Sequence, residues 1–159
     1  MAAEFEQLIK VHGGRIRAIA RRYADTDAVE DLYQEILVQL WRSIDSFRGD
    51  AKPETWIYRI GLNTALTSVR KQIRLREGKA AILNSQVSSE ESLGGRCQAE
   101  ILSEFMDSLA DVDSSIMMMY LDGLNGQEMS SVLGMKLNAV QVRINRLKQM
   151  FSDRYLEGE

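Results

Sequence analysis

A chain of 159 residues suffices for one domain or two small ones, and a hydrophobic content of 45% favours a packed core over global disorder. It contains neither an apolar run of about 18 residues nor a cationic stretch leading into an apolar one, so we expect a cytoplasmic protein without membrane insertion. A single cysteine, Cys97, excludes an internal disulfide, and with His12 as the only histidine we expect neither a metal site nor another cofactor.

The charge is unevenly distributed along the chain. A net charge of −3 argues by itself against nucleic acid as a partner. However, residues 48–76 hold seven Lys or Arg and two Asp or Glu. Residues 77–115 hold two Lys or Arg and eight Asp or Glu. A concentrated basic segment can bind nucleic acid even in an acidic protein, although charge alone equally allows a solvated helix face.

Apolar spacing predicts helices over residues 4–24 and about 27–47. In the first, the glycine pair at 13–14 should weaken or bend the helix. In the second, Asp27 is a candidate N-cap and Glu30 follows three residues later, as in a capping box. The only proline of the chain then marks a loop over residues 48–53.

A third long helix is predicted from Glu54 to about Arg76, with two neighbouring faces. At 100° per residue, each face falls within an arc of about 60°. The apolar face holds Leu62, Leu66, Val69 and Ile73. The polar, cationic face holds Arg59, Asn63, Arg70 and Arg74.

Residues 77–99 lose this periodicity and gain Ser, Gly and Glu, which is typical of a linker between domains. Shorter helices are predicted beyond it, over residues 100–109, 113–121, 127–133 and 138–151. No segment has a strand pattern. We therefore predict an all-α fold of two small helical domains, residues 1–76 and 100–159, joined by a flexible linker.

The last two predicted helices have the spacing of a helix-turn-helix. Asn125 and Glu128 can form a capping box at the start of the first, and Gly134 lies where a tight turn needs a positive φ. Asn138 is a candidate cap of the second helix. The side chains predicted to face outward on that helix are Gln141, Val142, Asn145 and Lys148. Such a helix could enter a DNA major groove, whereas the spacing alone equally fits an ordinary helical hairpin.

Three segments resemble known motifs. The first is Asp27-Ala28-Val29-Glu30-Asp31-Leu32-Tyr33-Gln34-Glu35, running on to Leu40-Trp41-Arg42. The second joins Phe47-Arg48-Gly49-Asp50 with Thr55-Trp56-Ile57-Tyr58-Arg59-Ile60-Gly61-Leu62-Asn63-Thr64-Ala65. The third is Gly123-Leu124-Asn125-Gly126-Gln127-Glu128-Met129 with Leu133-Gly134 and Val140-x-x-Arg143. The first two resemble region 2, and the third region 4, of bacterial extracytoplasmic-function (group IV) sigma factors.

The resemblance implies a factor that binds core RNA polymerase and directs promoter-specific initiation, through regions 2 and 4. Its partners would be the β′ clamp helices, the β flap, promoter DNA and an anti-sigma factor. The residues implied to bind the clamp helices are Asp31, Gln34, Glu35, Leu37 and Trp41. Those implied to bind the minus-ten element are Arg48, Lys52, Arg59, Asn63, Arg70 and Arg74, whereas for Trp56 we favour a core position. Those implied to read the minus-thirty-five element are Asn138, Gln141, Val142, Asn145 and Arg146.

One departure and several alternatives bear on this interpretation. Many relatives have a basic residue and Ser where this chain has Gln141-Val142, so an arginine–guanine contact would be lost there. The alternatives are a helical DNA-binding regulator that acts without polymerase and a sigma-like competitor that reads DNA poorly. An enzyme is disfavoured, because no group of residues is spaced for catalysis. The opposite charges of residues 48–76 and 77–115 would also permit the two domains to pack together and hide the basic face.

Overall fold

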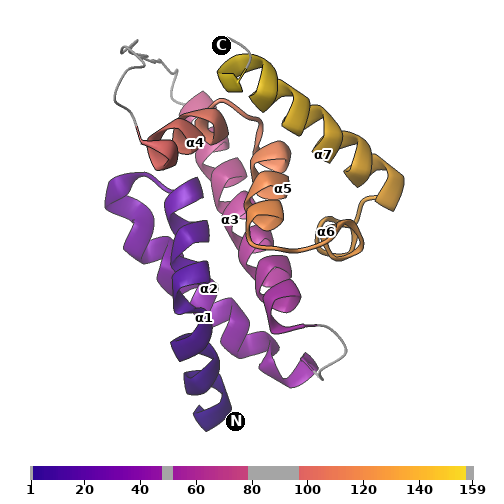
Figure 1. The fold of residues 1–159 in the computed structure, drawn as a ribbon. Helices are drawn as coiled ribbons and strands as arrows, with labels where there is room; N and C mark the ends of the chain where they lie inside the picture. Colours follow the sequence, from indigo (N-terminus) through magenta and orange to yellow (C-terminus); the bar gives the residue numbers. More distant parts are fainter. Residues whose placement is uncertain (1, 48–51, 79–96, 157–159) are drawn as a thin grey trace.

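The computed structural model describes residues 2–47, 52–78 and 97–156, and these residues form helices connected by short turns (Figure 1). No strand occurs among them, in agreement with the predicted all-α class. The α-helices are α1 (Ala2–Tyr23), α2 (Val29–Ser43), α3 (Pro53–Gly78), α4 (Gln98–Asp107), α5 (Asp111–Leu121), α6 (Gly126–Leu133) and α7 (Leu137–Phe151). Short 3-10 turns flank α2 at Thr26–Ala28 and Ile44–Ser46, and a π-helical turn, Ser152–Leu156, follows α7.

Helices α1, α2 and α3 pack on one another and form the N-terminal half, residues 2–78. In α2, Leu32, Ile36 and Leu40 recur every four residues and are 5%, 0% and 0% exposed. Burying one such side chain contributes about 2 kcal/mol, so this stripe holds α2 against its neighbours. Gly61 in α3 permits a close approach to α1, because a Cβ there would lie 2.9 Å from Cδ1 of Ile19.

Helices α4 to α7 form the C-terminal half, residues 97–156, in which α5 and α6 both contact α7. Val140, Ile144 and Leu147 give α7 its buried face, as the spacing predicts. Phe105 of α4 is fully buried and contacts Phe151 edge-on. The run Met117–Met119 is partly or fully buried in the same half.

The two halves lie directly against each other, with α3 in contact with both α5 and α6 (Figure 1). Their buried hydrophobic side chains form one cluster that extends from Ile16 in α1 to Leu147 in α7. The segment predicted to link them lies outside the described residues except at its ends, where α3 extends to Gly78 and α4 begins at Gln98. No helix in the described part of the chain has the length and apolar character needed to cross a membrane.

Helix α1 runs unbroken through Gly13 and Gly14, because packing against α2 and α3 outweighs the low helix propensity of glycine. Two predicted helix caps were wrong. Asp27 does not cap α2: it lies in a 3-10 turn closed by the Ala28 N–H to the Asp25 carbonyl, and Glu30 pairs with Arg17 instead. Asn138 lies inside α7, whose N-cap is Lys136.

Two other local predictions are confirmed. The side chain of Asn125 accepts from the Glu128 N–H, and the Glu128 carboxylate accepts from the Asn125 N–H, each at 2.8 Å. This capping box satisfies donors at the start of α6 that have no partner within the helix. Gly134 ends α6 with φ at 70°, a left-handed conformation that glycine adopts without steric cost.

Candidate nucleic-acid interface

The outer side of α2 presents the residues that the sequence predicts to bind polymerase. Asp31, Gln34 and Glu35 are exposed, and Leu37 is half-buried. Trp41 is 46% exposed although its ring contacts Phe5 edge-on, with centroids 5.1 Å apart. The sequence interpretation missed Val38, which lies on the same side and is 42% exposed. An exposed aromatic and an exposed aliphatic side chain beside carboxylates make this side suitable for binding another protein.

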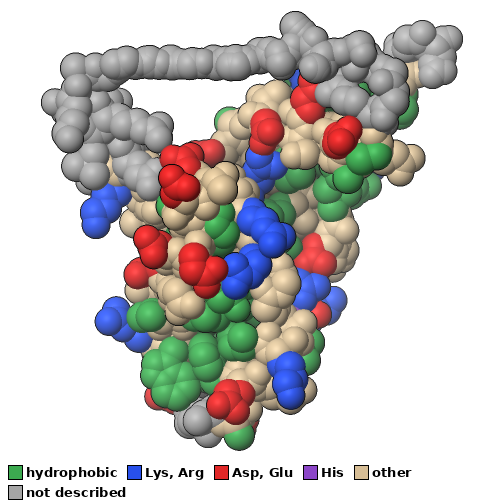
Figure 2. Space-filling model, turned by 90° about the vertical axis from the view of Figure 1, so that its left-hand side faces the viewer, with side chains coloured by type: hydrophobic (Ala, Val, Ile, Leu, Met, Phe, Trp, Pro, Cys, Tyr) green, Lys and Arg blue, Asp and Glu red, His purple; other side chains and the backbone are tan. Residues whose placement is uncertain are grey.

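Figure 2 shows the face of the molecule beside α1 and α2. Hydrophobic side chains gather toward its lower end, where α1 begins, and basic and acidic side chains lie side by side above them. Between α1 and α2, Arg17 donates to Glu30 at 3.0 Å, and its guanidinium lies 4.0 Å from the ring centroid of Tyr33. Positive and negative groups therefore alternate here rather than forming a field of one sign.

The cationic side of α3 is only partly free. Asn63 and Arg70 are exposed. Lys52, just before the helix, pairs with Glu128 at 2.9 Å, and Arg59 donates to the Ser131 hydroxyl. Arg48 and the side chain of Arg74 lie outside the described residues. Lys52 and Arg59, both predicted to contact DNA, thus bind side chains of α6 in this structure.

A polar groove of about 590 Å³ between α2 and α3 brings two predicted sets together. Asp31 and Glu35 line one side of it, and Asn63 and Lys71 line the other. The sequence interpretation assigned these two carboxylates to polymerase and the amide to DNA, without expecting a shared groove. Lys71 is an exposed cation that this interpretation omitted.

Trp56 stands at the start of α3 and is 4% exposed, which confirms the predicted core position. Its ring stacks on Phe47 with centroids 4.8 Å apart and an interplanar angle of 21°. The pair anchors the end of the 3-10 turn after α2 to the first turn of α3. Trp56 therefore has little surface to offer a ligand.

Helix α7 carries all five side chains predicted to read the minus-thirty-five element. Asn138, Gln141, Val142, Asn145 and Arg146 are exposed. Arg143 is held differently, because its guanidinium donates to Asp113 of α5 at 2.7 Å. A free polar face on the second helix of a helix-turn-helix is the geometry that enters a major groove.

Comparison with known proteins agrees with the region 2 motifs. Residues 8–75 match the family model described as sigma-70 region 2. The ECF RNA polymerase sigma-E factor of Haemophilus influenzae is 24% identical over 94% of this chain and 86% of that protein. The factor of the same name from Escherichia coli K12 is 26% identical over 94% of this chain and 85% of that protein. The chain is thus similar to these sigma factors over nearly its whole length, and the family model itself matches residues 8–75.

Two solved structures share the fold of this chain. The sigma factor RpoE from Bartonella quintana, crystallised in complex with the anti-sigma factor NepR, has a TM-score of 0.79 and 18% identity. That match covers 94% of this chain and 95% of the other. CnrH in complex with the cytosolic domain of CnrY has a TM-score of 0.67 and 23% identity, over 96% and 88% of the two chains.

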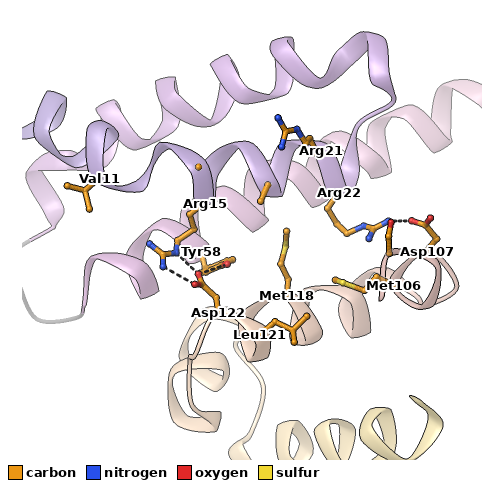
Figure 3. Close-up of a pocket in the computed structure, with 13 residues that line it drawn as sticks. Val11, Arg15, Arg21, Arg22, Tyr58, Met106, Asp107, Met118, Leu121 and Asp122 are labelled. Atoms are coloured by element: carbon orange, nitrogen blue, oxygen red, sulfur yellow. Dashed lines mark hydrogen bonds and ion pairs between the residues drawn. The ribbon is translucent and has the colours of Figure 1, made fainter. Parts of the chain in front are cut away.

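A polar cluster between the two halves of the chain was missed by the sequence interpretation. Arg15 of α1 and Tyr58 of α3 converge on Asp122, which directly follows α5 (Figure 3). Arg15 Nη2 donates to Asp122 Oδ1 at 2.9 Å, and the Tyr58 hydroxyl donates to Asp122 Oδ2 at 2.8 Å. These hydrogen bonds, that of Arg15 above all, hold the pKa of Asp122 below its ordinary value.

The same cluster raises the pKa of Tyr58, through burial first and then through its hydrogen bond to Asp122. Nearby, Arg22 of α1 pairs with Asp107 of α4, and both line one groove of about 760 Å³ with Arg15 and Asp122 (Figure 3). No local sequence signal marks these pairs, since 107 and 85 residues separate the partners.

Proposed function

We propose that this protein binds core RNA polymerase and directs initiation at specific promoters. The observation that carries the proposal is the sigma-70 region 2 match over residues 8–75, which coincides with an exposed acidic side of α2 and a cationic side of α3. In this assignment residues 1–76 act as region 2 and residues 100–159 as region 4, with residues 77–99 between them. The protein acts in the cytoplasm by binding, without catalysis of its own.

Polymerase binding is assigned to α2. Asp31, Gln34 and Glu35 supply charge and hydrogen bonding toward the β′ clamp helices, and Leu37 and Trp41 supply apolar contact. An acidic side repels DNA phosphates and suits a basic partner helix, so its charge favours protein over nucleic acid. Binding of the polymerase β flap is assigned to the C-terminal half of this protein.

Minus-ten recognition is assigned to the segment from Arg48 to Glu54 and to α3. Lys52, Arg59, Arg70 and Arg74 would hold phosphates of the melted non-template strand. Asn63 is the residue assigned to read a base, because its amide both donates and accepts. Extruding a base costs a few kcal/mol, which phosphate and stacking contacts must offset.

Minus-thirty-five recognition is assigned to α7, through Asn138, Gln141, Val142, Asn145 and Arg146. Gln141 can bond adenine in a bidentate manner, whereas Val142 can contact a thymine methyl group. We therefore expect this chain to prefer an upstream element richer in A·T pairs than an arginine at these positions would select.

An anti-sigma factor is assigned as a further partner. The RpoE structure described above contains the anti-sigma factor NepR, and the CnrH structure contains the cytosolic domain of CnrY. The C-terminal half offers an apolar groove of about 510 Å³, lined by residues that include Met117, Tyr120 and Phe151. A groove of this character suits an apolar helix face.

In vitro transcription tests the proposal. Core polymerase and this protein are incubated with a pool of randomised promoters, and the transcripts that start are sequenced. Initiation at a shared motif is expected. Replacing Arg146 with Ala should reduce initiation by about tenfold where the upstream element is present, as for loss of one DNA contact worth 1–3 kcal/mol. Gln149→Ala, an exposed change on α7 outside the assigned set, should leave initiation unchanged.

Association with core polymerase provides the second readout. The double variant Asp31→Ala, Glu35→Ala should lose co-purification, whereas Asp45→Ala, an exposed carboxylate beyond α2, should keep it. Co-purification without initiation would favour a competitor over an initiation factor. Failure of the wild-type protein to associate with core at all would leave a DNA-binding regulator and overturn the proposal.

A further inference from the structure

The described contacts that Lys and Arg side chains make between the two halves are segregated by charge. We define the clasp as the four pairs Arg15–Asp122, Arg22–Asp107, Lys52–Glu128 and Arg59–Ser131. Every cation of the clasp belongs to the N-terminal half, and every acceptor belongs to α4, α6 or the turn after α5. The C-terminal half thus presents a row of oxygen acceptors, three of them from carboxylates, to a row of cations.

The centre of the clasp has the most hydrogen bonds. Arg15 binds Asp122 through two nitrogens, and Tyr58 adds a third hydrogen bond to the same carboxylate. The side chains of Arg15 and Asp122 are only 21% and 26% exposed, so water screens this pair less than it screens a surface pair. Lys52, at the periphery, is 67% exposed and contributes mainly its charge.

The clasp overlaps the surface assigned to promoter DNA. Lys52 and Arg59 both belong to the set assigned to minus-ten phosphates, and in this structure both bind side chains of α6. Carboxylate and hydroxyl oxygens there occupy the positions at which phosphate oxygens would be expected. A guanidinium or ammonium group engaged in this way must release its internal partner before it can bind a phosphate.

We propose that the clasp is an internal substitute for DNA phosphates, which keeps the free protein closed and lowers its affinity for DNA until the halves separate. This inference rests on the proposed function only in its DNA part. Closure itself follows from the contacts. The affinity measured for DNA then includes the fraction of molecules that are open, because only these present free cations.

Single-molecule energy transfer tests closure in the full chain. Donor and acceptor dyes are attached at Val38→Cys and Val142→Cys, two exposed positions on α2 and α7, in a Cys97→Ser background. The variant Asp122→Asn, Glu128→Gln keeps both side-chain shapes and removes two charges from the clasp. We expect it to raise the ratio of open to closed molecules about tenfold, equivalent to about 1.4 kcal/mol. Raising the salt concentration should open the unsubstituted protein in the same direction.

A charge-matched control separates the clasp from a general effect of net charge. The variant Asp113→Asn, Asp153→Asn also removes two carboxylate charges from the C-terminal half. The side chains that bind Asp113 and Asp153 are Arg143 and Gln149, and both lie within the C-terminal half. Transfer efficiency in this control should equal that of the unsubstituted protein. Equal efficiencies in the clasp variant and the control would overturn closure by the clasp.

The DNA part is tested with a fluorescein-labelled single-stranded oligonucleotide of mixed sequence, about 30 nucleotides long. The clasp variant should bind it about tenfold more tightly than the charge-matched control at the same salt concentration. Equal binding by the two, with the clasp variant open, would overturn the phosphate-substitute inference. Absence of binding by every form would count against the proposed DNA function, while energy transfer still decides closure.

Discussion

His12 shows how one side chain can make the stability of this protein depend on pH. It is 7% exposed, and its Nδ1 lies 2.6 Å from an Nη atom of Arg15. Burial, and then the charge of Arg15, lower the pKa of His12 from its ordinary value of 6.5. Arginine is always a donor here, so Nδ1 accepts and the imidazole is neutral in the folded protein.

We predict that the free energy of unfolding falls as the pH is lowered through about 6.5, the pKa of histidine in the unfolded chain. Below that value His12 binds a proton in the unfolded chain but not in the folded protein. The free energy of unfolding therefore continues to fall until the pH reaches the lowered pKa of His12 in the folded protein. Urea unfolding at about pH 7.5 and pH 5.5 measures the change. His12→Gln should reduce the dependence, and an equal dependence in both proteins would contradict the role of His12.

A second residue-scale prediction concerns Gly134, whose φ of 70° is unfavourable for any residue with a Cβ. Gly134→Ala should lower the free energy of unfolding by about 1 kcal/mol. Gly14→Ala is the matched control, because Gly14 lies inside α1 and a Cβ there would meet nothing within 4 Å. That change should raise stability by up to about 1 kcal/mol through helix propensity. Thermal unfolding of the two variants should therefore shift in opposite directions.

At the scale of an element, α6 depends on its capping box because it has only eight residues. An isolated helix of that length is marginal, so donors left unsatisfied at its start weigh heavily. The box also fixes where the helix begins and hence how α6 meets α3.

Asn125→Ala should destabilise the protein by about 1 kcal/mol, because the Glu128 N–H loses its acceptor. Asn125→Asp keeps an oxygen in place and should cost much less. Chemical denaturation followed by circular dichroism compares the two. An alanine variant as stable as the aspartate variant would show that water replaces the cap.

Helix starts illustrate what could be predicted from sequence at this scale. Asn125 and Glu128 were identified correctly because both halves of a capping box lie within four residues. Asp27 and Asn138 were assigned as caps from residue type alone, and the helices begin two residues later and one residue earlier. A cap is defined by where the backbone leaves helical geometry, and packing shifts that point by a residue or two.

At the scale of the whole molecule, the continuous core predicts that the two halves unfold together. The buried hydrophobic side chains form one cluster across both, so losing one half exposes apolar surface of the other. Trp41 and Trp56 both lie in the N-terminal half, whereas helical circular dichroism reports on all helices. The thermal transitions measured by tryptophan fluorescence and by circular dichroism should therefore coincide at low salt. A fluorescence midpoint clearly separate from the circular dichroism midpoint would contradict this.

The contact between the halves marks the limit of sequence interpretation. The region 2 and helix-turn-helix motifs could be found because each is encoded in neighbouring residues. The pairing of Arg15 with Asp122 has no local pattern, and uneven charge indicated only that packing was electrostatically permitted. The exposure of Gln141 and Arg146 followed from helical periodicity. The contacts of Lys52 and Arg59 with α6 depend on packing between residues more than 70 positions apart.

The two oxygens of Glu128 have separate tasks: Oε1 accepts from the Asn125 N–H, and Oε2 pairs with Lys52. A mutation that removes both oxygens, such as Glu128→Ala, would therefore weaken the helix-turn-helix together with the clasp. The Asp122 carboxylate, by contrast, bonds only with side chains of the N-terminal half among its described contacts. A genetic selection for variants in which the two halves stay apart should consequently recover substitutions of Asp122 often and of Glu128 rarely. The frequencies would show that Asp122 serves only the contact between the halves, whereas Glu128 is also needed for the structure of α6.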